Sequence, residues 1–99
     1  MSQINIAINQ LSAEINDYVN VLRRDTTKSI KLSYNIQMVI FDLAYHSVKA
    51  IEMGNLGRAY DLITDIANIS REFHDHDVIR DTEKIRAKIL QLVELNREI

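Results

Sequence analysis

Only two glycines and no proline occur among the 99 residues of this chain, and both glycines lie in one short stretch. Glycine and proline are the residues that most often end helices and strands. The stretch is therefore the clearest boundary in an otherwise uninterrupted chain. We expect Gly54, Asn55 and Gly57 to form a structural turn, in which Gly54 ends one helix in the left-handed conformation and Asn55 caps the next helix. A turn this short makes the two flanking helices antiparallel.

Apolar residues recur every three or four positions along four segments, which is the spacing of helices with one buried face. We expect these helices at about 3–23, 29–53, 56–73 and 78–97. The polar residues between the first two segments provide caps for a turn, and Asp75 or Asp77 can cap the last helix. The predicted fold is all-α, with one domain spanning 1–99. Its helices form two hairpins that pack as an antiparallel four-helix bundle.

The second segment is apolar over more of its circumference than the others. One heptad line passes through Leu32, Ile36, Val39, Leu43, His46 and Ala50. A second line, on a neighbouring face, contains Tyr34, Met38, Phe41 and Tyr45. A helix of this kind needs neighbours on more than one side, so we expect a dimer or a complex with a partner protein. The predicted partner-binding residues are the second line together with Ile8, Leu11 and Ile15 of the first helix, which also suit a core.

A short string across the glycine turn adds to this prediction. It consists of Ala50-Ile51-Glu52-Met53-Gly54-Asn55, followed by Ala59 and Leu62-Ile63. In these residues the chain is similar to small helical secretion and flagellar export chaperones, in which such a turn links two long helices. The resemblance implies that a partner's helix lies in a groove of the bundle. We therefore expect a non-enzymatic interaction protein: an adaptor, a secretion-type chaperone or a regulatory subunit.

The string His46-Ser47-Val48-Lys49-Ala50, followed by Asn55-Leu56-Gly57, resembles the signature of histidine phosphotransfer domains. The resemblance implies that His46 accepts a phosphoryl group and that Lys49 helps to neutralise it. The chain departs from that signature at Ala50 and at the three residues that follow, where small side chains are usual. The heptad line through His46 favours instead a histidine packed between helices. Phosphotransfer is the first alternative function.

Four basic residues surround the predicted first turn, within 23–31. They are Arg23, Arg24, Lys28 and Lys31. Such a cluster can meet phosphate groups, so a nucleic-acid-binding regulator is the second alternative. Asp25 interrupts the cluster, and no helix-turn-helix pattern accompanies it. The net charge of −2 also argues against a dense basic face.

Other functional classes lack their usual residues. Cysteine is absent, which excludes disulfides and thiolate ligands. His74 and His76 supply two metal ligands at most, whereas a stable zinc site uses three or four, so we expect no metal. The sequence contains neither a phosphate-binding glycine loop nor a serine nucleophile motif, and we expect no enzymatic activity and no cofactor. No apolar run reaches the ~18 residues of a membrane span, and we expect a cytoplasmic protein.

Overall fold

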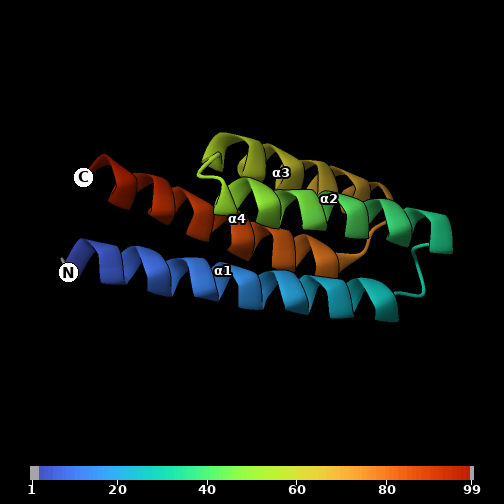
Figure 1. Cartoon of the computed structure of the whole chain (residues 1–99). Coiled ribbons are helices and arrows are strands. Elements are labelled where there is room, and N and C mark those ends of the chain that lie inside the picture. The colour runs from blue at the N-terminus through green and yellow to red at the C-terminus, as the bar shows by residue number, and fades with distance from the viewer. Residues whose placement is uncertain (1–2, 99) are drawn as a thin grey trace.

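The computed structural model describes residues 3–98, which form four helices joined by short connections. The helices are α1 (Gln3–Lys28), α2 (Tyr34–Glu52), α3 (Leu56–Glu72) and α4 (His76–Arg97). They run alternately up and down, so that both ends of the chain lie at the same end of an elongated bundle (Figure 1). The predicted all-α, four-helix bundle is confirmed. No helix among residues 3–98 is long and apolar enough to cross a membrane.

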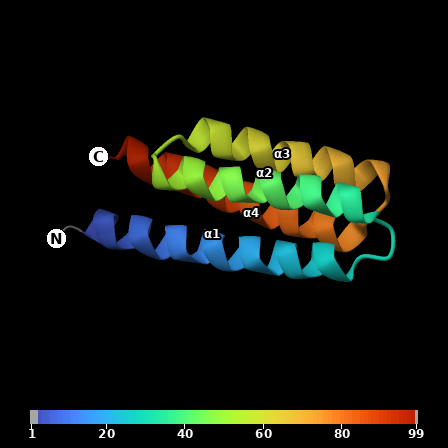
Figure 2. The ribbon, with the colours of Figure 1, turned by 45° about the vertical axis from the view of Figure 1, so that its right-hand side comes forward.

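The helices pack unevenly around the bundle. α1 packs extensively against α4, α4 against α3 and α3 against α2, whereas α1 and α2 make much less contact (Figure 2). α1 and α2 are therefore neighbours in sequence but do not form a self-contained hairpin. The principal neighbour of α1 is α4, at the opposite end of the sequence.

Branched aliphatic side chains fill the centre of the bundle. α1 contributes Ile15, Val19 and Leu22, and α4 contributes Val78, Ile85 and Ile89, all of them fully buried. Four buried hydroxyl groups also face the interior, and each donates to a backbone carbonyl of its own helix. These are the hydroxyls of Thr26, Ser47, Ser70 and Thr82. No hydroxyl of this set is left unpaired at a cost in free energy.

The first turn lies about five residues later than predicted, because α1 continues to Lys28 and α2 begins at Tyr34. The buried stripe of α1 extends from Leu22 to Thr26, whose hydroxyl donates to the Leu22 carbonyl at 2.7 Å. The N-cap of α2 is Ser33, whose Oγ accepts from the backbone N–H of Ile36. Residues 23–28, which look like a capping turn in the sequence, are thus tied into the helix by packing.

The buried face of α2 also differs from the predicted heptad line. Val39 and His46 are exposed, whereas Ile40, Ala44 and Ser47 are fully buried. Small side chains let a helix approach its neighbour closely, and α3 presents Ala59, Ala67 and Ser70 in its own buried face. Packing density therefore turns the small residues of α2 inward. Several of its larger apolar side chains, including those of Tyr34, Met38 and Tyr45, are left exposed.

The two remaining turns have the same construction. Gly54 and His74 both have positive φ, 77° and 58°, immediately after the end of a helix. The residue that follows, Asn55 or Asp75, donates its N–H to a carbonyl five residues back at 2.8 and 3.0 Å. The same residue then caps the next helix, with its side-chain oxygen accepting a backbone N–H at 3.1 Å. Gly57 lies inside α3 rather than in the turn.

Candidate functional site: an apolar stripe on α2

Four large side chains lie along the outer part of α2 at heptad spacing. We call Tyr34, Met38, Phe41 and Tyr45 the α2 stripe. Tyr34 is 71% exposed and Tyr45 is 51% exposed, while Met38 is also exposed and Phe41 is half-buried. Large apolar side chains that stay outside the core in a regular line mark a surface that favours a partner.

The α2 stripe borders the loosest seam of the bundle. Gln37 lies on the same flank, three residues after Tyr34 and four before Phe41, and its amide donates to the carbonyls of Ser29 and Leu32 at 3.4 and 3.2 Å. Those carbonyls belong to the connection that leaves α1, so this flank of α2 faces the α1 side. Among the helix pairs that touch, α1 and α2 also contact each other least. A ligand helix placed on the stripe would lie beside this seam.

The three partner-binding residues predicted on α1 do not lie on the surface beside the α2 stripe. Ile15 is fully buried, Leu11 is almost fully buried, and Ile8 is half-buried against the core. Their heptad line is the inward face of α1, so the structure does not bring them to the surface with the α2 stripe. Of the predicted partner-binding residues, those that the structure leaves exposed therefore all lie on α2.

His46 is exposed rather than packed between helices, so the expectation from its heptad line is wrong. Its side chain is 48% exposed, and its Nε2 lies 3.5 Å from the carboxylate of Asp42. The Tyr45 ring meets the His46 ring edge-on, with centroids 5.4 Å apart. Lys49 Nζ lies over the Tyr45 ring, 5.5 Å from its centroid, and pairs with Glu52 at 3.3 Å. The lysine is thus directed toward the stripe and Glu52.

The basic residues of the predicted first turn do not gather on one face. Arg23 bonds to Asn20, and Lys31 donates to the backbone carbonyl of His74 at 2.9 Å. Because successive helical residues are 100° apart, Arg24 lies on a different face from Arg23, whereas Arg24 and Lys28, four residues apart, share a face of α1. Asp25, between these cations and Lys28, faces α4. Lys31 thus joins the α1–α2 connection to the α3–α4 turn, and the four cations do not form one surface that could bind a polyanion.

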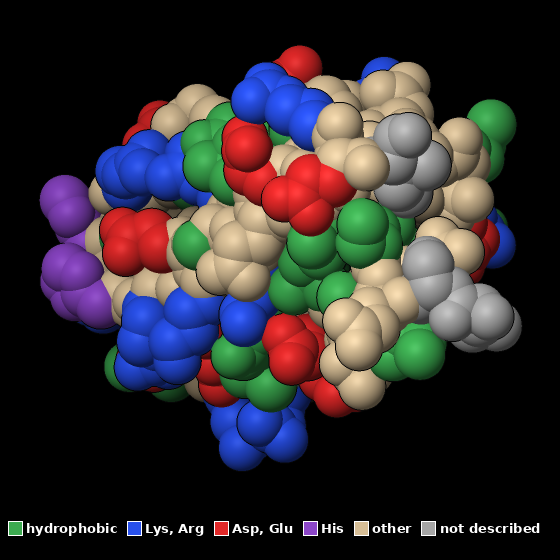
Figure 3. All heavy atoms as spheres, turned by 90° about the vertical axis from the view of Figure 1, so that its left-hand side faces the viewer, with side chains coloured by type: hydrophobic (Ala, Val, Ile, Leu, Met, Phe, Trp, Pro, Cys, Tyr) green, Lys and Arg blue, Asp and Glu red, His purple; other side chains and the backbone are tan. Residues whose placement is uncertain are grey.

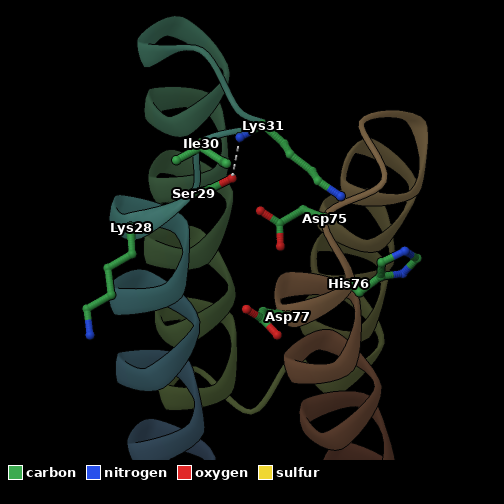
Figure 4. A pocket seen from close by; sticks show the side chains of 7 residues that line it. All are labelled: Lys28, Ser29, Ile30, Lys31, Asp75, His76 and Asp77. Atoms are coloured by element: carbon green, nitrogen blue, oxygen red, sulfur yellow. Dashed lines mark hydrogen bonds between the residues drawn. The ribbon is translucent and has the colours of Figure 1, made fainter.

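A pocket of about 330 Å³ lies at the end of the bundle where the α1–α2 connection meets the start of α4 (Figure 4). It is lined by Lys28, Ser29, Ile30, Lys31, Asp75, His76 and Asp77. Lys31 reaches across toward the α3–α4 turn, while Lys28 and His76 point away from each other (Figure 4). Asp75 is already occupied as the cap of α4. Among residues 3–98, no three His, Asp or Glu side chains are placed to hold a metal ion.

Sequence reasoning missed a carboxylate cluster between α1 and α4. Asp25 and Asp81 lie on either side of one guanidinium nitrogen of Arg80, each with an oxygen at 3.7 Å. The pKa of Asp81 is raised to about 7, chiefly by burial and further by a hydrogen bond with Asp25 and by the charge of Asp25. These residues come together only because α1 and α4 pack side by side in this register, so no local sequence motif predicts the cluster.

Comparison of the chain with protein-family models, curated proteins and solved structures finds no match. Its function is therefore inferred from the geometry of its own residues. Seen from the end that carries both termini, the surface mixes acidic, basic and hydrophobic side chains, with hydrophobic groups gathered near the middle (Figure 3). That view shows no continuous field of one charge, whereas α2 carries a regular apolar line.

Proposed function

We propose that this chain is a non-enzymatic interaction protein, an adaptor, secretion-type chaperone or regulatory subunit, that binds a partner protein's helix along the α2 stripe. The observation that carries the proposal is that α2 presents different side chains to the core and to the surface. Its small residues pack inward against the bundle, while Tyr34 and Tyr45 remain largely exposed. A protein that needed α2 only for its core would gain nothing from this outward line.

The geometry of the stripe fits a helical ligand. Its members recur at the heptad spacing with which two helices interlock their side chains. Tyrosine, phenylalanine and methionine are enriched at the centres of protein interfaces, where they bury large areas with few rotatable bonds. Four side chains cover less than the ~800 Å² that each partner contributes to a typical stable interface. The size of the stripe thus favours a single docked helix over a broad contact between two bundles.

The solution mass of the purified chain tests the proposal. We expect light scattering at micromolar concentration to show a complex heavier than the 11.5 kDa chain, either with a partner that co-purifies from the native host or with a second copy. A mass of two copies would mean that the chain self-associates. A mass of 11.5 kDa together with no co-purifying protein would contradict the proposal.

One observation favours a second candidate, histidine phosphotransfer through His46. Its imidazole is exposed, as this reaction requires, with Lys49 one turn further along α2. The Asp42 carboxylate beside Nε2 acts against it, because a negative charge repels an incoming phosphoryl group. If His46 serves this function, acetyl phosphate will label the wild type and leave His46→Gln unlabelled. An unlabelled wild type would end this candidate and leave the helix-binding proposal intact.

A further inference from the structure

The carboxylate cluster holds the end of α1 against the start of α4. Nη2 of Arg80 lies 3.7 Å from Oδ2 of Asp25 and 3.7 Å from Oδ1 of Asp81, and Nη1 lies 3.3 Å from Asp77. Three carboxylates therefore share a single guanidinium group, which is itself half-exposed. One positive charge cannot balance three negative ones, so the cluster carries excess negative charge when all three are ionised.

Burial makes that excess costly at one position. The Asp81 side chain is 4% exposed, and its Oδ2 has no hydrogen-bond partner among the residues that the structure describes. Asp25 is 19% exposed, while Asp77 is open to solvent. Two adjacent carboxyl groups with little access to water retain a proton between them more readily than either would alone. Asp77 takes no part in this sharing because water solvates it.

The charged groups that face Asp81 come from both helices of this interface. Asp25 of α1 disfavours its ionised form, while Arg80 and Lys84 of α4 favour it. Burial is the largest influence, and the net effect raises the pKa of Asp81 to about 7. The free carboxyl group of an unfolded chain has a pKa near 4, so the folded pair holds a proton that the separated helices release. Contact between α1 and α4 and protonation therefore favour each other.

The Asp25–Asp81 pair lies at the C-terminal end of α1, where the contact with α4 keeps this helix in the bundle. Asp25 is in the last turn of α1, just before the connection 29–33, and Lys28 and Ser29 there line the surface pocket. On one side this part of α1 rests on α4, and on the other it adjoins α2, with which α1 makes little contact. A weaker contact with α4 would thus free the end of α1 without first breaking the α2–α3 or α3–α4 packing.

We propose that Asp25 and Asp81 form a proton-operated latch, in which a shared proton fastens the C-terminal end of α1 to α4 and loss of the proton loosens it. The latch is independent of what binds the α2 stripe. As pH rises from about 4 to about 7, between the unfolded and folded pKa values, the folded pair loses its advantage over the unfolded carboxyl groups. Above the folded pKa both states are ionised, and the effect levels off.

Amide hydrogen exchange of the wild-type chain between about pH 5 and 8 tests the latch. We expect protection factors in segment 22–33, corrected for the intrinsic exchange rate, to fall by up to roughly tenfold per pH unit toward pH 7 and then level off. Segment 59–67 of α3 should stay better protected than segment 22–33 across this range, because the latch opens without unfolding α3. No pH dependence in segment 22–33, or equal protection in both segments, would overturn the proposal.

Two variants and a control locate the effect. Asp81→Asn preserves the shape of the side chain but cannot lose a proton in this range, so segment 22–33 should become insensitive to pH. Asp25→Asn removes the neighbouring negative charge but leaves Asp81 buried, so it should weaken the dependence without abolishing it. The control Asp77→Asn removes an exposed carboxylate that pairs with the same Arg80. In this variant segment 22–33 should keep the pH dependence of the wild type. Unchanged pH dependence in Asp81→Asn and Asp25→Asn would show that another group is responsible and would overturn the latch.

Discussion

Ile15→Ala should lower the free energy of unfolding by about 2–5 kcal/mol, which is the usual cost of truncating a fully buried isoleucine. The side chain is enclosed in the core of the bundle, and alanine leaves a cavity that its rigid neighbours cannot fill completely. Urea unfolding followed by circular dichroism measures the loss. This is the largest effect that we expect from any change in the residues considered for partner binding.

The matched change Tyr34→Ala should affect partner binding and leave the stability of the fold nearly unchanged. Because Tyr34 is mostly exposed, its loss should change the free energy of unfolding by less than about 0.5 kcal/mol. Its effect should appear in partner binding instead. Equal destabilisation by Ile15→Ala and Tyr34→Ala would mean that the α2 stripe is part of the core, contrary to the structure.

Gly54→Val should be the most damaging change outside the core, with a loss of about 2 kcal/mol or more in the free energy of unfolding. Gly54 has a φ of 77°, which a β-branched residue adopts only under strain. No neighbouring atom lies within 4 Å of the place where its Cβ would be, so the cost is in the backbone rather than in a steric clash. Thermal unfolding should show a midpoint lower by at least about 8 °C.

Two companion variants separate this explanation from a general intolerance of change in the turns. His74 has a φ of 58° in the equivalent turn, so His74→Gly should stabilise the protein by about 0.5–1 kcal/mol. Gly57 lies in α3 with open space beside it, and Gly57→Ala should be neutral or stabilise by up to about 1 kcal/mol. A stable Gly54→Val variant, or a destabilised His74→Gly variant, would contradict the role assigned to positive φ.

The sequence was sufficient to predict the second turn because its signals are local. Gly54 and Asn55 provide, in adjacent positions, a residue that tolerates positive φ and a side chain that caps a helix. The third turn has the same geometry, but histidine occupies the place of the glycine, and only its cap, Asp75, could be anticipated. α4 accordingly begins at His76, two residues earlier than predicted.

Features that depend on packing between distant segments were harder to predict. Thr26 looks like a turn residue, yet the core of the bundle buries it and extends α1 beyond the expected boundary. His46 and Val39 follow an apolar heptad line, but close packing of the small residues of α2 rotates that line outward. In both cases tertiary contacts outweigh the local pattern, which by itself indicates only that a helix forms.

The α2 stripe was predicted from the surplus of apolar faces on the second helix. The exposure of the stripe could not be predicted from the sequence, since the same residues would equally suit a larger core. The pairing of Asp25 with Asp81 had no precursor in the sequence, because it arises from the register between α1 and α4. A buried ionisable pair of this kind becomes visible only when the two helices are placed side by side.

The most direct test of the central claim compares complex formation by two variants of equal design. Tyr34→Gln/Tyr45→Gln removes exposed apolar area from the stripe, and Val39→Gln removes it from the opposite flank of the same helix. Binding of the wild-type partner, or of a second copy, should fall at least roughly tenfold in the first variant, as expected for the loss of more than about 1.4 kcal/mol of interface energy. Val39→Gln should bind like the wild type. Undiminished binding by the double variant, with its fold intact, would contradict the claim that the α2 stripe is the binding surface.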